Sequence, residues 1–364
     1  MMAAEEPPAN NLPALDTLCA HWAEDPARFH GAVIPPIFQN SLFTFPDCET
    51  RDRLWAGRTQ TGVEGADALF EYTRVSNPTT AIVEAKIAVL ERGEQARCFS
   101  SGMAAISAAV LSCVRTGDHV IAPETVYGPT RVLLSEYLPR FHIETTYVDG
   151  RDPEDFVRAL RPNTRLIYLE SPSTGVFYQQ DLQAVAALAR SQGIATICDN
   201  SWASPCFQNP IPLGIDLVVH SATKYLGGHS DVIAGVVVGP ASRMEDLSAR
   251  EGCLLGAVLD PFAAWLLLRG VRTLSVRMER HQRNALQVAT FLNAHPAIAR
   301  VFYPGLPDAP QAALSARQLR GFSSFSVALR DPGQAAAYRF VNRLRYFGIG
   351  CSWGGFESLA MPMQ

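Results

Sequence analysis

The strongest constraint on the fold is a regular alternation of short apolar runs with helical patterns between about residues 78 and 240. Apolar runs of strand length occur at 95–100, 118–123, 164–170, 194–200, 216–221 and 233–239. Between them lie segments with helical spacing of apolar residues, at 78–91, 101–114 and 181–193. Strands and helices that alternate in this way form a mostly parallel sheet whose two faces are covered by helices. The sequence therefore predicts an α/β fold.

The pattern changes on either side of this core, which predicts three parts. Residues 1–72 lack a regular pattern and include a proline-containing apolar stretch at 31–45. We therefore expect an extended arm that packs on another part of the protein or contributes to a neighbouring subunit. Residues 73–265 form the predicted large domain. Residues 266–364 form a predicted smaller α+β domain, with a long helical pattern interrupted at Gly270, a strand at 322–329 and a helix that ends near Arg345.

Charge and cysteine usage exclude several classes of protein. The net charge of −4 gives no reason to expect a nucleic acid or an anionic membrane as partner. The eight cysteines are dispersed and none forms a C-x-x-C pair, which predicts reduced thiols and no metal site. No apolar stretch approaches the ~20 residues that span a bilayer. We therefore expect a cytoplasmic protein.

Polar residues follow several of the predicted strands, where an open α/β sheet binds ligands. Glu170, Asp199 and His220 close three of them, and Lys224 lies in S-A-T-K-Y-L-G-G-H-S just after the third. The common nucleotide, hydrolase and metalloprotease motifs are missing from the sequence, namely the P-loop, G-x-G-x-x-G, G-x-S-x-G and H-E-x-x-H. Taken singly, each residue has a structural explanation: a surface lysine, a turn aspartate or a core histidine.

Together, these residues suit pyridoxal phosphate (PLP), which needs an amine, a carboxylate near its ring nitrogen, a phosphate cradle and a flat partner for its ring. Lys224 can supply the amine, Asp199 the carboxylate and Tyr127 the ring partner. A helix that begins at a glycine offers free N–H groups to an anion, and nearby hydroxyls add donors. The predicted cradle comprises Gly102, Met103, Ser221 and Thr223.

The order of several motifs resembles the Cys/Met-metabolism family of PLP enzymes. They include Y-T-R-V-S-N-P-T, F-S-S-G-M-A-A-I, Y-G-P-T, L-E-S-P-S, D-N-S-W-A-S-P and S-A-T-K-Y, and the resemblance runs from residue 34 to residue 359. It implies a fold type I PLP enzyme in which Lys224 forms the Schiff base with PLP and moves protons, and in which Tyr127 and Tyr72 are catalytic as well.

The resemblance also implies an assembly. Tyr72 and Arg74 match the pair that reaches the PLP phosphate of the neighbouring subunit, so the site would exist only in a dimer, and the family is typically a tetramer built as a dimer of dimers. Arginine suits this role because its planar fork can make two parallel hydrogen bonds to a phosphate.

Two local features favour one branch of the family, the β-eliminating carbon–sulfur lyases that convert L-cystathionine to homocysteine, pyruvate and ammonia. Ser352 and Trp353 lie in C-S-W-G-G-F-E-S-L, which resembles bacterial cystathionine β-lyase, and the resemblance assigns them to the substrate. Thr174-Gly175 stands where many γ-acting members have Asn-Pro. The alternatives are γ-elimination of cystathionine or methionine, and γ-replacement on an acylated homoserine.

The C-terminal domain looks truncated by comparison with the family, which has a further segment with an arginine for the substrate carboxylate. No residue up to Gln364 matches that arginine. A non-enzymatic alternative is therefore a PLP-binding relic that lacks the arginine.

Overall fold

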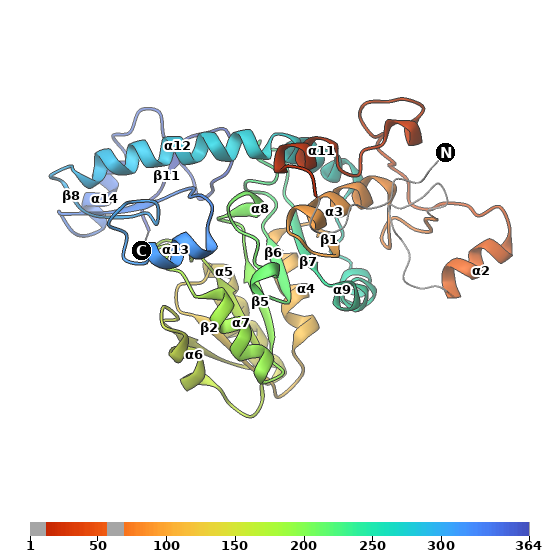
Figure 1. Ribbon diagram of the computed structural model, residues 1–364, viewed down its shortest axis with the longest axis horizontal. Helices are drawn as coiled ribbons and strands as arrows, with labels where there is room; N and C mark the ends of the chain where they lie inside the picture. The colour runs from red at the N-terminus through yellow and green to blue at the C-terminus, as the bar shows by residue number, and fades with distance from the viewer. Residues whose placement is uncertain (1–11, 57–68, 364) are drawn as a thin grey trace.

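The computed structural model describes residues 12–56 and 69–363. A central sheet with helices on both sides forms the middle of the molecule, and the long helix α12 (Leu274–Asn293) runs from it to the C-terminal part (Figure 1). The predicted α/β fold is confirmed. Residues 1–11 and 57–68 of the predicted arm lie outside the described residues.

The central sheet has seven strands in the order β1-β7-β6-β5-β4-β2-β3. They are β1 (Gln95–Phe99), β2 (His119–Pro123), β3 (Glu144–Val148), β4 (Thr164–Glu170), β5 (Ala195–Asp199), β6 (Leu217–His220) and β7 (Gly235–Gly239). Strands β2 to β6 pair in parallel, whereas β7 is antiparallel to both of its neighbours, β1 and β6. All strands except β7 therefore end at the same edge.

Successive residues of the buried strands belong to two different apolar cores, one on each face of the sheet. In β4, Leu166 and Tyr168 join one core while Ile167 and Leu169 join the other. This alternation follows from the two-residue period of a strand. Because both faces are covered, the strands read as continuous apolar runs in the sequence.

Side-chain caps fix where several helices begin. Asn77 accepts a hydrogen bond from the Thr79 N–H at 2.9 Å at the start of α3, and Ser101 accepts one from the Ala104 N–H at 3.1 Å at the start of α4. The helices before and around the sheet are α1 (Leu15–His21), α2 (Cys48–Ala56), α3 (Pro78–Leu90), α4 (Gly102–Cys113), α5 (Gly128–Val132), α6 (Pro153–Ala159), α7 (Leu182–Ser191), α8 (Ser204–Phe207), α9 (Ala241–Leu247) and α10 (Cys253–Leu255).

The C-terminal part has a small apolar core of its own, built from α12 and the antiparallel pair β8 (Ile298–Phe302) and β9 (Ser326–Leu329). Its remaining elements are α11 (Pro261–Arg272), α13 (Ala312–Gln318), α14 (Gln334–Val341), β10 (Gly348–Ile349) and β11 (Leu359–Ala360). The predicted break at Gly270 is wrong, because the two long helices divide at Thr273. Gly270 instead lets α11 approach the chain at Gly227, whose carbonyl oxygen would be 2.1 Å from an added Cβ.

The first part of the predicted arm is not extended. Helix α1 packs on α3 and α11, and Lys86 of α3, fully buried, donates to the Cys19 carbonyl at 2.8 Å and pairs with Glu24, which also pairs with Arg272. The stretch that follows exposes apolar side chains, with Val33 83% and Leu42 56% exposed. Its packing on a neighbouring subunit and the predicted domain boundaries at 72 and 265 stay predictions.

Among the described residues no helix is long and apolar enough to cross a membrane. The same part of the chain holds no group of three metal-ligating side chains.

Candidate active site

The predicted site residues converge because their strands end at one edge of the sheet. Ser101 and Gly102 follow β1, Tyr127 follows β2, Asp199 ends β5, and Lys224 follows β6. This is the edge at which open α/β sheets bind ligands.

Lys224 is half-buried against the loop at residues 351–355. Its Nζ donates to Ser352 Oγ at 2.8 Å and lies 4.7 Å from the centroid of the Trp353 ring. Gly354 lies directly on the backbone of Lys224, since a Cβ added there would be 2.7 Å from the Lys224 carbonyl carbon. Burial lowers the pKa of the Lys224 amine, which raises the share of the neutral, nucleophilic form.

Lys224 is also singled out by composition, because the whole chain contains two lysines. The other, Lys86, is fully buried and paired with Glu24 on the far side of the apolar core. Lys224 is therefore the one lysine whose amine can reach a ligand.

Asp199 is buried at the end of β5. Its Oδ1 accepts the Ser201 N–H at 2.9 Å, and the Tyr168 hydroxyl lies 3.5 Å from its Oδ2. Burial raises the pKa of Asp199, and these contacts and the charge of His220 lower it in turn. Ser201 connects this strand to the next, because its Oγ accepts the Ser221 N–H at 2.7 Å.

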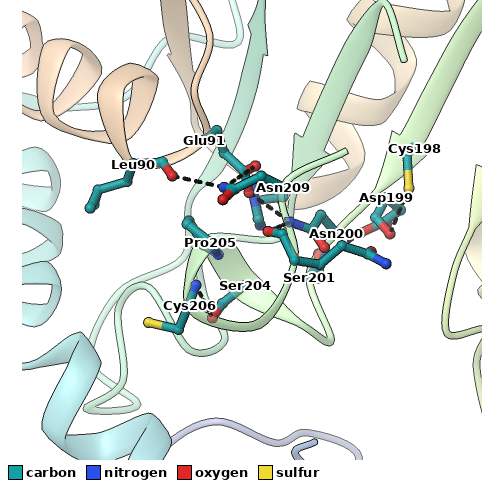
Figure 2. A network of polar contacts seen from close by, with 12 residues as sticks. Leu90, Glu91, Cys198, Asp199, Asn200, Ser201, Ser204, Pro205, Cys206 and Asn209 are labelled. Atoms are coloured by element: carbon teal, nitrogen blue, oxygen red, sulfur yellow. Dashed lines mark hydrogen bonds and ion pairs between the residues drawn. The ribbon is translucent and has the colours of Figure 1, made fainter. Parts of the chain in front are cut away.

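A buried polar network lies beyond Asp199 (Figure 2). Glu91 Oε1 is 2.6 Å from His220 Nε2 and accepts from Asn200 Nδ2 at 2.7 Å. Asn209 Nδ2 donates to the Leu90 carbonyl at 2.9 Å. The network fixes the turn after β5 to the end of α3, which holds Asp199 in place.

The predicted phosphate cradle is a close contact between α4 and the turn after β6. A Cβ added at Gly102 would lie 2.8 Å from Ser221 Oγ, so only a glycine fits there. Ser101 caps the Ala104 N–H, which leaves the earlier N–H groups of Gly102 and Met103 at the free end of the helix. The Thr223 hydroxyl bonds Ala234, donating to its carbonyl and accepting its N–H at 3.0 Å, so it stabilises the turn.

Tyr127 is half-buried, and its N–H donates to Glu170 Oε2 at 2.7 Å. Burial raises the pKa of its hydroxyl, and the charges of Cys351 and Asp199 act in the same direction. Tyr127 is therefore bonded through its backbone to the residue that ends β4.

Tyr72 and Arg74 lie apart from the Lys224 cluster. The Arg74 guanidinium donates to the Cys253 carbonyl at 3.0 Å and lies 5.6 Å from the centroid of the Tyr72 ring. Both residues line a surface cavity of about 460 Å³, together with residues 39–41 and 258–261. The contacts described for Tyr72 and Arg74 do not include Lys224 of the same chain. Their predicted role toward a neighbouring subunit stays a prediction.

The structure adds Glu170 and Thr174 to the predicted set. Glu170 pairs with Asp199 in the register of β4 and β5, and Thr174 donates to its Oε1. Burial raises the pKa of Glu170 to about 8, and Asp199 adds to that rise. The sequence signal for Glu170 is its position at the end of a predicted strand, but only the register of β4 and β5 shows that it adjoins Asp199.

Residues 16–364 match the family model of the Cys/Met metabolism PLP-dependent enzymes. The chain belongs to this family. L-methionine gamma-lyase of Porphyromonas gingivalis is 41% identical over 331 residues, which cover 90% of this chain and 81% of the relative. Cystathionine gamma-synthase of Mycobacterium bovis is 40% identical over 347 residues, 95% of this chain and 85% of the relative.

Solved structures agree with the fold. The crystal structure of cystathionine gamma-lyase from Lactobacillus plantarum with L-serine matches with a TM-score of 0.86 and 37% identity, over 96% of this chain and 87% of that one. The predicted family, fold and cofactor are confirmed. These relatives are γ-acting enzymes, so they support the γ-acting alternative better than the β-lyase branch.

The residues present fit PLP. Two buried carboxyls end β4 and β5 at the sheet edge where the half-buried Lys224 follows β6. A helix N-terminus is packed so closely on Ser221 that a Cβ would fill the space between them. In the described part of the chain, the Trp353 Nε1 is buried and has no hydrogen-bond partner, so it is free to donate to a ligand.

Proposed function

We propose that this protein is a PLP-dependent enzyme that breaks or forms a carbon–sulfur bond at the γ-carbon of an amino acid, by elimination from a sulfur-containing amino acid or by replacement on an acylated homoserine. The observation that carries the proposal is the half-buried Lys224 amine, which donates to Ser352 and follows β6, the strand next to the one that Asp199 ends. The γ-acting relatives, at 40–41% identity over most of the chain, favour this branch.

When bound, PLP supplies an electron sink that stabilises negative charge next to the α-carbon of an amino acid. Lys224, Asp199 and Tyr127 would hold its aldehyde, ring nitrogen and ring face, and the N-terminus of α4 with Ser221 would hold its phosphate. These assignments follow the resemblance and the convergence of the side chains at one edge.

Lys224 then moves protons at Nζ. Its lowered pKa favours an amine that takes a proton from a carbon of the substrate and returns it at another. Ser352, which accepts from Nζ, would orient the amine and hold the substrate carboxylate. The Trp353 ring beside it would exclude water from the reacting carbons.

A second candidate is β-elimination of cystathionine. The observation in its favour is the Ser-Trp-Gly-Gly loop, whose serine and tryptophan both contact Lys224. The same amine can serve either reaction, so the products decide between them.

The test is incubation of the PLP-loaded protein with L-methionine, with L-cystathionine, and with an O-acylhomoserine plus cysteine. 2-Oxobutyrate, or cystathionine in the third reaction, supports γ-carbon chemistry. Pyruvate and homocysteine from cystathionine, without 2-oxobutyrate, would replace it with the β-lyase assignment. Bound PLP with no product from any substrate would contradict both and favour the relic.

A further inference from the structure

Glu170 bridges two loops at the edge of the sheet. Its Oε2 accepts the N–H of Tyr127, in the loop after β2, at 2.7 Å, and its Oε1 accepts the hydroxyl of Thr174, in the loop after β4. A second bond between the same loops, from Thr125 Oγ1 to Ser173 Oγ at 2.7 Å, lies beside the first. The carboxyl therefore connects the Tyr127 segment to the loop at 171–178.

Glu170 also adjoins Asp199, its partner in the register of the parallel strands β4 and β5. Both residues are 7% exposed, and Asp199 has a compensating charge nearby in His220. Two buried carboxylates side by side repel each other, so one of them is favoured as the neutral acid. Burial and the neighbouring Asp199 raise the pKa of Glu170 to about 8, and burial raises the pKa of Asp199 as well.

We infer that Glu170 is a positioning residue of the PLP site, which fixes Tyr127 against the cofactor ring and joins the loops after β2 and β4. It acts through Tyr127 and does not itself touch the reacting atoms. The inference rests on PLP binding and is independent of the choice between β- and γ-carbon chemistry.

The test compares Glu170→Ala with Glu170→Gln. Alanine removes the acceptor for the Tyr127 N–H, whereas glutamine keeps it through its amide oxygen. We expect Glu170→Ala to weaken PLP binding about tenfold and to lower kcat by a similar factor with little change in KM, since a buried hydrogen bond is worth about that much. Glu170→Gln should restore most of the PLP affinity.

The matched control is Glu84→Ala. Glu84 is a half-buried carboxyl that also accepts a backbone N–H, from Cys98 at 2.8 Å, but it is bonded neither to Tyr127 nor to Thr174. Glu84→Ala should leave PLP affinity within about twofold of the wild-type value. An equal loss in Glu84→Ala would reduce the Glu170 effect to general destabilisation and overturn the inference.

A double-mutant cycle separates positioning from mere support of the fold. If Glu170 acts through Tyr127, Glu170→Ala should cost little further PLP affinity in a Tyr127→Ala background. Additive losses in the cycle, or unchanged PLP affinity in Glu170→Ala, would overturn the inference. If Glu170→Ala does not fold, Glu170→Asp takes its place, because its shorter side chain cannot reach the Tyr127 N–H.

Discussion

At the scale of single residues, we propose that Lys224 carries the chemistry, since it follows a strand end and its amine contacts the 351–355 loop. Its partners, Ser352 and Trp353, come from a segment more than a hundred residues away. The chain has one other lysine, buried in an ion pair. A chemical test can therefore identify the PLP-bearing side chain without ambiguity.

Borohydride reduction of the PLP-loaded protein should attach the cofactor permanently to Lys224. Peptide mass spectrometry should find the added mass in the peptide that contains Lys224 and none on Lys86. Lys224→Ala should lose the visible absorption band of bound PLP and at least about 10³-fold in activity, because it lacks both the amine and the proton carrier. A retained band in that variant would contradict the assignment.

Glu170 should make the apoprotein less stable as the pH rises. Its folded pKa of about 8 exceeds the unfolded value of 4.5, so the folded state holds a proton that the unfolded state loses. The free energy of unfolding should therefore fall between pH 4.5 and 8, by up to about 1.4 kcal/mol per pH unit from this group.

Glu170→Gln has no titrating carboxyl at this position, so its free energy of unfolding should fall less between pH 4.5 and 8 than that of the wild type. Urea unfolding of the apoprotein at a series of pH values measures the difference. A slope equal to that of the wild type would show that Glu170 does not carry the proton.

At the scale of elements, the close contact between α4 and the turn after β6 is the proposed phosphate cradle. Gly102 and Gly128 are both the first residue of a helix, but an added Cβ would meet Ser221 at the first and open space at the second. Gly102→Ala should weaken PLP binding about tenfold, from about 1–3 kcal/mol of overpacking, while Gly128→Ala should not. Fluorescence titration of the apoprotein with PLP measures both, and equal affinities would place the phosphate elsewhere.

Sequence patterns sufficed for the buried strands of the central sheet but did not identify β3 at its edge. Strands β4 and β5 each contain a continuous buried run with several apolar residues because both faces of the sheet are covered, which makes them recognisable in the sequence. Strand β3 (E-T-T-Y-V) lies at the sheet edge and is mostly half-exposed. Its sequence therefore lacks a continuous apolar run and does not indicate a strand. The antiparallel direction of β7 and the pairing of Glu170 with Asp199 depend on register, which one sequence does not display.

The residues of the candidate site divide in the same way, into those that sequence motifs identify and those whose contacts only the structure shows. Lys224, Asp199 and Gly102 stand in recognisable motifs, and their convergence follows from the parallel sheet. The bridge from Glu170 to Tyr127 involves a backbone N–H, which no residue type signals. The separation of Arg74 from Lys224 within one chain also required the structure.

At the scale of the whole molecule, a buried ion cluster holds the N-terminal helix against the core. Glu24→Gln should leave Lys86 without its charged partner and cost about 3–5 kcal/mol in the free energy of unfolding, whereas Asp149→Asn, which breaks the exposed pair with Arg151, should cost under about 1 kcal/mol. Urea unfolding measures both. Similar small losses would mean that α1 is not anchored through Glu24.

If Arg74 completes the site of a neighbouring subunit, two inactive variants should restore each other's activity in a mixed assembly. Arg74→Ala and Lys224→Ala should each be inactive, but a mixed assembly of the two should regain activity, because one of its sites receives an intact lysine from one subunit and an intact arginine from the other. The measurement is activity after the two variants are unfolded together and refolded. No recovery, with mixed assemblies present, would confine the site to one chain.

Gly354 has a consequence for how this scaffold can change its reaction. The 351–355 loop rests on Lys224 through backbone contact, so the distance between the lysine and the loop does not depend on the side chains at 351–353. Those side chains can be exchanged while the spacing stays the same. Under the proposed function, exchanging the side chains at 351–353 would change which part of the substrate lies near the Lys224 amine, while the backbone contact at Gly354 is retained.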